Sequence, residues 1–383
     1  MTLVHGEGGT APSLSDARRI VIKIGSALLV DPERATLRTE WLAGLCADIA
    51  QLKKAGRDVI VVSSGAIALA RHQLGKTNAK LRLEEKQALA SIGQIGLAQG
   101  WQNALSLYGL TAGQLLLTQD DTEDRERHLN ARATLETLLQ LGCVPIINEN
   151  DAVATSEIRF GDNDRLAARV AQMTASDTLI LLSDIDGLYT ADPRKEPEAR
   201  FLPVIEHVTD DVMALGGEPP PGYSSGGMRT KLLAARIANR AGTNMIIASG
   251  YHPSPIKRLI EGGLCTWFCA EIDTGSARKR WIGSGLSAKG SLTVDAGAEQ
   301  ALSKGASLLS AGISRVSGKF KRGDLIAVCN QDDEHIAIGL ANYNSDEVQR
   351  LVGQRTCFMP DILGYCGPDE LIHRDNLSLL KAW

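Results

Sequence analysis

A polar cluster at the end of an apolar run most constrains how this chain can fold. Residues 144–147 are apolar and mostly β-branched, which predicts a buried strand, and the polar residues 148–151 (NEND) follow directly. A second polar cluster, residues 161–164 (GDND), opens a helical pattern shortly afterwards. Open α/β sheets bind their ligands at the carboxyl ends of parallel strands. We therefore expect a ligand site where the two clusters meet.

Apolar runs and helical patterns alternate through the first two-thirds of the chain. Strands are expected at residues 19–24, 57–62, 111–117, 143–147 and 178–182. Helices are expected at residues 39–55, from about 65, at 84–107, 122–141 and 232–241. Strands that are apolar on both faces and separated by helices indicate a parallel sheet covered on both sides. The predicted fold class is α/β, a three-layer α/β/α sandwich with a mainly parallel central sheet.

The pattern changes after about residue 281. Short strands are expected at residues 291–294, 312–316, 324–328, 336–340 and 361–365, with one helix at 298–303. Short, closely spaced strands with turn signals predict a small β-barrel-like domain. The expected organisation is a flexible N-terminal arm (1–17), an α/β domain (18–270), a linker (271–280), a second domain (281–375) and a C-terminal tail (376–383).

Charge and composition exclude some classes of protein. The net charge is −4, and the segment from residue 281 onward contains 10 Lys and Arg residues and 12 Asp and Glu residues. Neither value indicates a basic surface, so nucleic acid is not an expected partner. No stretch approaches the roughly 20 apolar residues that span a bilayer, and the first residues do not resemble a secretory signal. Seven scattered cysteines indicate reduced thiols. We expect a cytoplasmic protein with no membrane partner.

Two glycine-containing turns after strands are candidates for anion binding. Lys23 lies near the end of an otherwise apolar strand. Burying its ammonium group costs free energy unless an anion binds to it. We therefore predict a phosphate contact for Lys23, with a lysine whose ammonium reaches solvent as the alternative. Gly25 would let the backbone approach that phosphate. In the second turn, Ser64 can bind an anion at a helix N-terminus or be a simple helix cap.

A third turn, residues 223–231, combines hydroxyls, two adjacent glycines and Lys231 at the start of an apolar helix. The spacing differs from the Walker A pattern, and a flexible loop is the alternative interpretation. Three such turns on one α/β scaffold nevertheless favour the binding of a nucleoside triphosphate.

These blocks resemble a known family. VIKIGSALL, VVSSGAIA, EDRERHLNAR, VPIINENDAVAT, GDNDRLAA, SDIDGLYTADPR and SSGGMRTKLLAA are similar to the bacterial glutamate 5-kinases of the amino acid kinase superfamily. SLTVDAGAEQAL, GKFKRGDLI and ILGY are similar to the PUA domain of that family, so the resemblance covers about residues 18–375. It implies the amino acid kinase fold. It also implies ATP-dependent phosphorylation of the γ-carboxylate of L-glutamate, the first step of proline biosynthesis, with Mg²⁺ accompanying ATP.

The resemblance also implies roles for individual residues. Lys23 and Lys231 would neutralise the transferring phosphoryl group, and Asp164 would orient both lysines. Ser64, Asp151 and Asn163 match glutamate-binding positions, and Asp162 joins them at the amino end of the substrate. The implied ATP-binding residues are Lys23, Gly25, Ser183, Asp184, Ser225, Gly226, Gly227, Met228, Arg229, Thr230 and Lys231.

The implied reaction makes chemical sense without a general base. The γ-carboxylate of glutamate has a pKa near ~4.3 and is already ionised at neutral pH. Positioning and positive charge then do most of the catalysis. Asp151 and Asp162 suit the α-ammonium of the substrate, while Asn163, Ser64 and backbone N–H groups suit its α-carboxylate. Residues 148–150 could bind the substrate or could close the loop through hydrogen bonds to the backbone.

Other partners and functions remain open at this point. The resemblance implies feedback inhibition by L-proline near residues 124–127, which could equally be a solvated helix start. It also implies a homo-oligomer, a dimer or a tetramer. The alternatives are an aspartate, acetylglutamate or nucleotide kinase of the same superfamily, or an RNA-binding PUA protein.

Overall fold

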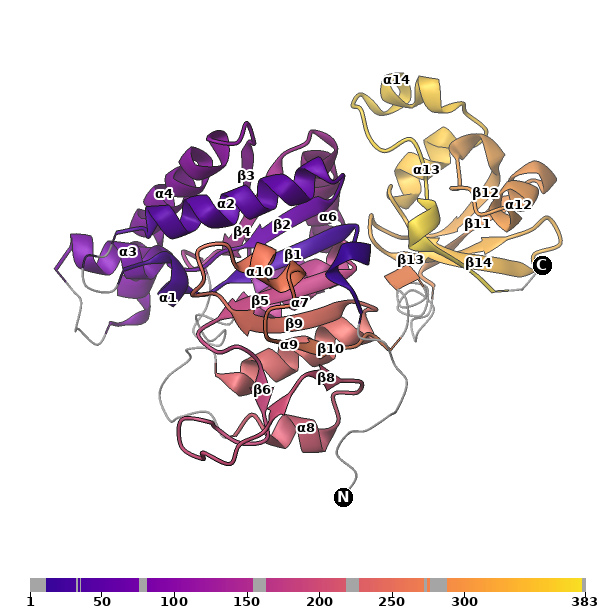
Figure 1. Cartoon of the computed structure of the whole chain (residues 1–383). Coiled ribbons are helices and arrows are strands. Elements are labelled where there is room, and N and C mark those ends of the chain that lie inside the picture. The colour runs from indigo at the N-terminus through magenta and orange to yellow at the C-terminus, as the bar shows by residue number, and fades with distance from the viewer. Residues whose placement is uncertain are drawn as a thin grey trace. The chain divides into compact units, whose positions relative to one another are not determined.

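A computed structural model describes residues 12–31, 34, 36–75, 81–153, 163–217, 227–271, 274–275 and 288–380 (Figure 1). Its contacts divide the chain into two compact units. The first contains residues 1–123 and 130–274, and the second contains residues 124–129 and 275–383. None of the described helices is long and apolar enough to cross a membrane.

The first unit is built on one sheet that contains eight of the described strands, in the order β3-β4-β2-β1-β5-β9-β10-β8. Neighbouring strands run parallel except β9 and β10, which are antiparallel. The strands are β1 (Arg19–Ile24), β2 (Asp58–Val62), β3 (Ala112–Leu117), β4 (Val144–Glu149), β5 (Thr178–Ser183), β8 (Val204–Ile205), β9 (Asn244–Ser249) and β10 (Cys265–Phe268). A short hairpin of β6 (Leu188–Tyr189) and β7 (Phe201–Leu202) accompanies it.

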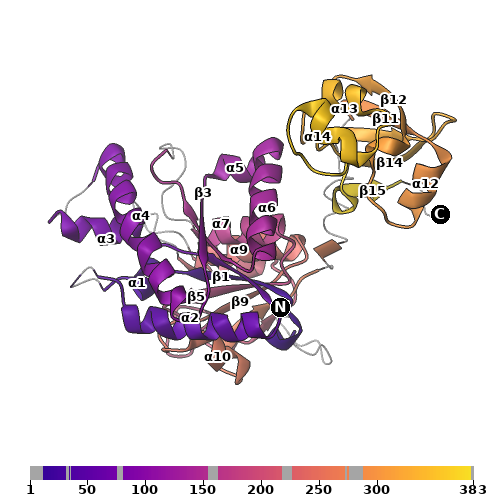
Figure 2. The ribbon, with the colours of Figure 1, turned by 90° about the horizontal axis from the view of Figure 1, so that it is seen from above.

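Helices cover both faces of this sheet (Figure 2). One face carries α1 (Ser26–Leu29), α2 (Thr39–Lys54), α3 (Ala66–Gln73), α4 (Leu83–Ser106) and α10 (Pro255–Ile260). The other carries α6 (Arg125–Gln140), α7 (Asn163–Met173), α8 (Asp210–Ala214) and α9 (Met228–Arg240). The predicted three-layer α/β/α sandwich is therefore confirmed.

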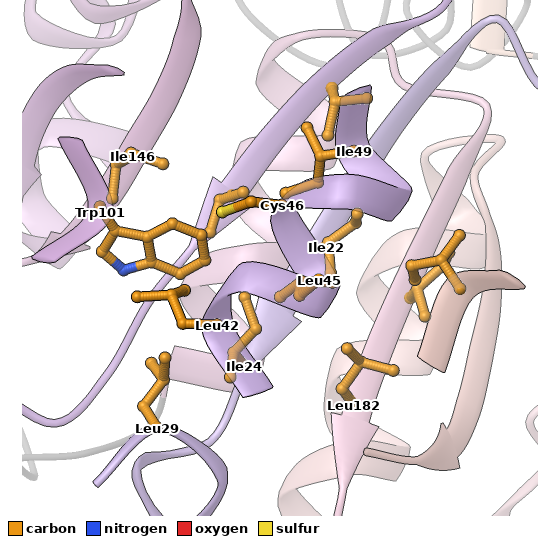
Figure 3. Packing of buried hydrophobic residues seen from close by; sticks show 14 of the residues in the cluster. Ile22, Ile24, Leu29, Leu42, Leu45, Cys46, Ile49, Trp101, Ile146 and Leu182 are labelled. Atoms are coloured by element: carbon orange, nitrogen blue, oxygen red, sulfur yellow. The ribbon is translucent and has the colours of Figure 1, made fainter. Parts of the chain in front are cut away.

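The alternation of side chains along β1 determines which layer each residue joins. Ile20, Ile22 and Ile24 belong to the core that contains the buried residues of α2. Figure 3 shows Ile22, Ile24 and Trp101 in this core. Val21 packs on the opposite side, against α7 and α9. Successive side chains of a strand point to opposite faces. Lys23 therefore points to the same side as Val21, which is the side of α7 and α9.

One expected helix is interrupted. Residues 122–141 were expected as a single helix, but the structure has α5 (Gln119–Glu123) followed by α6, with a break at Asp124. The side chain of Asp124 accepts a hydrogen bond from the backbone N–H of Arg127 at 3.0 Å. Aspartate caps helix N-termini well, because its carboxylate satisfies an N–H that has no partner within the helix. The new helix therefore begins at Arg125.

The second unit contains a five-stranded sheet in the order β12-β11-β13-β14-β15. Its strands are β11 (Gly290–Val294), β12 (Ile313–Gly318), β13 (Leu325–Cys329), β14 (His335–Leu340) and β15 (Leu377–Leu379). Irregular pairing at Thr293 and Val328 interrupts two of its ladders, and such bulges bend a sheet. Leu292, Val328 and Tyr343 belong to its own hydrophobic core. Helices α12 (Ala296–Ser303), α13 (Ser345–Leu351) and α14 (Met359–Leu363) complete the unit.

The strand expected at residues 361–365 is wrong, because this segment belongs to α14 and the turn after it. Pro360 lies in the first turn of the helix, where its missing N–H costs nothing. Gly364 ends the helix with a φ of 84°, a left-handed conformation that glycine adopts readily. These two helix boundary signals outweigh the apolar residues between them.

Parts of the expected N-terminal arm and C-terminal tail belong to the folded units. Leu14 and Ala17, in the expected N-terminal arm, are buried in the core of the first unit. Strand β15 lies within the stretch expected as a C-terminal tail. Most of the expected linker, residues 272–273 and 276–280, lies outside the described residues.

Candidate functional site

Three charged side chains meet on the α7–α9 side of the sheet. Lys23 comes from the end of β1, Asp164 from the first turn of α7, and Lys231 from the first turn of α9. The two lysines form ion pairs with different oxygens of Asp164. Lys23 Nζ lies 2.5 Å from Oδ1, and Lys231 Nζ lies 3.0 Å from Oδ2. Residues separated by up to 208 positions in sequence thus form one group, which we call the charged triad.

The charged triad is buried and carries a net positive charge. Lys23, Asp164 and Lys231 are 8%, 1% and 6% exposed. Burial by itself would raise the pKa of Asp164, but the charges and hydrogen bonds of the two lysines outweigh it and hold that pKa well below its usual range. Two ammonium groups and one carboxylate sum to +1. Because unbalanced buried charge is costly, this arrangement favours an anionic ligand.

Backbone positions beside the charged triad are open. Gly25 and Gly227 precede the first turns of α1 and α9, and a Cβ atom built on either would meet no atom of the described residues within 4 Å. Met228, Arg229 and Thr230 form the first turn of α9, and the Thr230 hydroxyl lies 3.2 Å from Asp164 Oδ2. Ser225 and Gly226 lie outside the described residues. The open space fits a group that approaches the backbone closely, as a phosphate does.

A second group, of neutral side chains, adjoins the charged triad. Asn163 precedes Asp164 at the start of α7, is 4% exposed, and points its Nδ2 at three oxygens. These are the Ser63 carbonyl oxygen at 2.9 Å, Ser64 Oγ at 2.7 Å and Asn148 Oδ1 at 3.0 Å. Asn148 Nδ2 donates in turn to Gln94 Oε1 at 2.7 Å. We call Gln94, Asn148, Asn163 and Ser64 the amide network.

The structure thereby answers one question that the sequence left open. Asn148 is 3% exposed and accepts from the backbone N–H of Glu149 at 2.9 Å as well as from Asn163. It is therefore a buried structural residue that supports Asn163. Sequence reasoning missed Gln94, because nothing in the pattern of α4 distinguishes it from the other glutamines of that helix.

Asp151 follows β4 in a turn at the same edge of the sheet and is partly exposed. Burial raises the pKa of its carboxyl to about 6. A carboxylate with this pKa is ionised at neutral pH and gains from a cationic partner. Asp162 lies outside the described residues.

Ser183 and Asp184 lie at the end of β5. Ser183 Oγ donates to Asp184 Oδ1 at 3.0 Å, and an NH2 of Arg194 lies 3.3 Å from Asp184 Oδ2. Burial opposes ionisation of Asp184, but these two partners hold its pKa below the usual value. Sequence reasoning did not single out Arg194, although it closes the block SDIDGLYTADPR.

Asp184 also borders a cleft of about 630 Å³. Other residues that line it include Tyr189, Arg194, Ser249, Tyr251 and Arg258. Ligand pockets commonly enclose roughly 300–1,000 Å³, so this cleft is large enough for part of a nucleotide. A smaller cavity of about 180 Å³ lies beside α2 and α10 and is lined by none of the predicted site residues.

Metal ligands are scarce in the described part of the chain. No group of three or more His, Cys, Asp or Glu side chains is placed there to hold an ion. Mg²⁺ in phosphotransferases is commonly held by one or two carboxylates together with the substrate phosphates.

Comparison with known proteins places the chain in a family. A model of the amino acid kinase family matches residues 18–249, and a model of the PUA domain matches residues 290–360. A glutamate 5-kinase of Gluconobacter oxydans (strain 621H) is 67% identical over 370 residues, which are 97% of this chain and 98% of that protein. A glutamate 5-kinase of Paramagnetospirillum magneticum is 53% identical over 366 residues, 96% of this chain and 99% of that one.

Among solved structures, a UMP kinase from Ureaplasma parvum aligns with a TM-score of 0.48 and 21% identity, over 66% of this chain and 98% of its own. The family models confirm the expected amino acid kinase fold and the appended PUA domain. With relatives this similar over nearly its whole length, the chain belongs to the glutamate 5-kinase family of the amino acid kinases.

Proposed function

We propose that this protein transfers the γ-phosphoryl group of ATP to the γ-carboxylate of L-glutamate and so forms L-glutamyl 5-phosphate. The observation that carries the proposal is the charged triad, a buried group with a net charge of +1 at the carboxyl ends of β1 and its neighbours. The relatives that share most of its length are named glutamate 5-kinases.

The two lysines supply the catalytic charge. Both reactants are anions, and in the transition state negative charge spreads over the oxygens of the transferring phosphoryl group. Lys23 and Lys231 approach Asp164 from two different elements, so their ammonium groups are already in place before substrate binds. Preorganised charge of this kind lowers the barrier, because nothing has to reorient during the reaction. The attacking carboxylate is ionised and needs no base.

Glutamate would bind at the amide network. Ser64, Asp151 and Asn163 surround the carboxyl ends of β2 and β4, next to the charged triad. Asp151 provides a negative charge for the α-ammonium, and we assign Asp162 the same role. The Ser64 hydroxyl and backbone N–H groups would receive a carboxylate.

ATP would bind along the ends of β5 and α9. Gly25, Gly227 and the first turn of α9 leave open space for phosphates, and we assign Ser225 and Gly226 to the same loop. Asp184, which accepts a hydrogen bond from Ser183, borders the 630 Å³ cleft, which would take the nucleoside part. Mg²⁺ would enter with the phosphates and neutralise part of their charge.

Trapping of the acyl phosphate tests the proposal. Purified protein is incubated with Mg-ATP and hydroxylamine, and glutamate, aspartate, acetylglutamate or uridylate is offered separately. We expect a hydroxamate with glutamate, since hydroxylamine captures glutamyl phosphate. ATP consumption with uridylate, together with no hydroxamate from glutamate, would contradict the proposal. Hydroxamate from aspartate or acetylglutamate alone would reassign the substrate.

Proline is a second expected ligand. It carries an α-carboxylate and a ring ammonium, so it presents the same two groups that Ser64 and Asp151 would recognise in glutamate. We expect proline to raise the apparent KM for glutamate. Unchanged turnover at saturating proline would contradict this expectation.

Two further properties follow from the family resemblance. We propose that the protein is a homo-oligomer, a dimer or a tetramer, which sedimentation of the purified protein would measure. We also propose that it works in the cytoplasm. All seven cysteines are free thiols, which suits a reducing compartment.

A further inference from the structure

Backbone groups determine the orientation of the Asn163 and Asn148 amides, and Asn148 in turn determines that of Gln94. The Ser63 carbonyl can only accept a hydrogen bond, so the nearby end of Asn163 must be its Nδ2. The backbone N–H of Glu149 can only donate, so the nearby end of Asn148 must be its Oδ1. Asn148 Nδ2 therefore points toward α4, so the Gln94 atom that accepts its hydrogen bond must be Oε1.

Ser63 is itself held firmly by the core. Trp101 Nε1 donates to Ser63 Oγ at 3.0 Å, and Trp101 is fully buried among Leu42, Ile146 and other apolar side chains (Figure 3). Gln94 and Trp101 both belong to α4. This helix therefore anchors the network at two points, one through Ser63 and one through Asn148.

The network leaves Asn163 with a free acceptor and no free donor. Its two N–H hydrogens are shared among three protein oxygens, so none remains for a substrate. Its Oδ1 is buried and has no hydrogen-bond partner among the described residues. Ser64 accepts from Asn163, so its own hydroxyl hydrogen remains available to a ligand. A buried oxygen in this state requires a donor.

We propose that Gln94 is a positioning residue for glutamate binding: acting through Asn148, it holds the Asn163 amide so that Oδ1 accepts a hydrogen bond from the substrate's α-ammonium. The inference rests on the proposed function, because it takes Asn163 to lie in the glutamate site. It differs from the expectation that Asn163 donates to the α-carboxylate. That role passes to Ser64 and to backbone N–H groups.

Gln94→Met tests the inference, because methionine has a similar length but a poor acceptor. Without the acceptor at Gln94, Asn148 and then Asn163 lose their fixed orientation. We expect the KM for glutamate to rise about tenfold, the effect of one misplaced buried hydrogen bond, while the KM for ATP stays within about twofold. The inhibition constant of glutarate, which lacks the α-ammonium, should also stay within about twofold of wild type.

Two further variants separate positioning from a general effect on the helix. Gln99→Met makes the same change on α4, where Gln99 is exposed and donates to Asn103 of the same helix, and should leave every constant unchanged. Gln94→Glu keeps oxygens that accept, so its KM for glutamate should lie nearer to wild type than that of Gln94→Met. Thermal unfolding of each variant reports folding.

Three results would overturn the inference. The first is an unchanged glutamate KM in folded Gln94→Met, and the second is an equal loss of glutarate and glutamate binding. The third is a Gln94→Glu variant as weak as Gln94→Met. Calorimetric binding of glutamate to each variant needs no turnover, so the inference can be judged even if the wild-type protein yields no glutamyl hydroxamate. Failure of the wild type to bind glutamate at all would count against the proposed function instead.

Discussion

The charged triad and the amide network lie side by side, yet they are built on different physical principles. Asn163 and Asp164, consecutive residues of α7, belong to one group each. The triad holds ions, whose attraction acts over several ångströms and in every direction. The network holds neutral amides, whose hydrogen bonds act only at short range and in one orientation. Charge thus suits the phosphoryl group, whereas direction suits a substrate with distinct ends.

The difference predicts how each group fails. Loss of the Asp164 carboxylate leaves two like charges buried together, which affects both stability and rate. Loss of one amide in the network leaves the fold intact but permits the wrong orientation.

Asp164→Asn should be the most damaging change. It preserves shape but leaves two buried ammonium groups without their carboxylate, and removal of one partner of a buried pair costs about 3–5 kcal/mol. We also expect kcat to fall by about 10³, since the lysines lose their fixed positions. Thermal unfolding and hydroxamate formation measure the two effects. The control is Asp210→Asn, an exposed partner of Arg236, which should change little.

Lys231→Met should affect rate much more than binding. The ammonium stabilises charge that develops in the transition state, so we expect kcat to fall by about 10²–10³ with a small change in the KM for glutamate. Lys257→Met, an exposed lysine of α10, provides the matched control. A large rise in glutamate KM with kcat preserved would place Lys231 in substrate binding instead.

Asn163→Asp should disrupt the amide network and weaken glutamate binding. The new carboxylate has no hydrogen to donate to the Ser63 carbonyl or to Asn148 Oδ1, so the network loses its centre. We expect the KM for glutamate to rise about 100-fold, the effect of two lost buried hydrogen bonds at about tenfold each, with the KM for ATP nearly unchanged. An equal rise in both constants would mean that the two groups do not work separately.

The pH dependence of glutamate binding should report Asp151. Burial raises the pKa of Asp151 to about 6, so acidification below that value protonates the carboxyl and removes its attraction for the α-ammonium. We expect the KM for glutamate to rise as pH falls from 7 to 5, by up to about tenfold per pH unit below pH 6. Asp151→Asn should bind weakly at all pH values and lose this dependence.

The same pKa has an opposite effect on the stability of the free protein. A carboxyl whose folded pKa lies above its unfolded value of 3.8 binds its proton more tightly in the folded state. Its contribution to stability is therefore fully present below pH 3.8 and is lost as pH rises through about 6. Weaker binding and a more favourable Asp151 contribution to stability at pH 5 would together identify this group. Thermal unfolding of the wild type and of Asp151→Asn at pH 5 and pH 7 isolates the contribution of Asp151 to stability.

Local pattern was enough for most elements of the fold. Apolar strands separated by amphipathic helices predicted the three-layer sandwich, because a strand that is apolar on both faces must be covered on both sides. The pattern failed where short boundary signals decide the structure. Asp124 divides one expected helix, and Pro360 and Gly364 form a helix where a strand was expected.

The layers, the PUA domain and the residue types of the site could be predicted from the sequence alone, since periodicity and motif are local properties. The blocks placed Lys23, Asp164 and Lys231 on the list of candidates, but they carried no distances. Only the tertiary structure brought the ammonium groups of both lysines within 3.0 Å of the Asp164 carboxylate. It alone revealed Gln94, because a hydrogen bond between α4 and β4 depends on the packing of segments that are 54 residues apart. Spacing along the chain cannot specify such a direction, since an amide has two ends and only its neighbours in space decide which one faces the substrate.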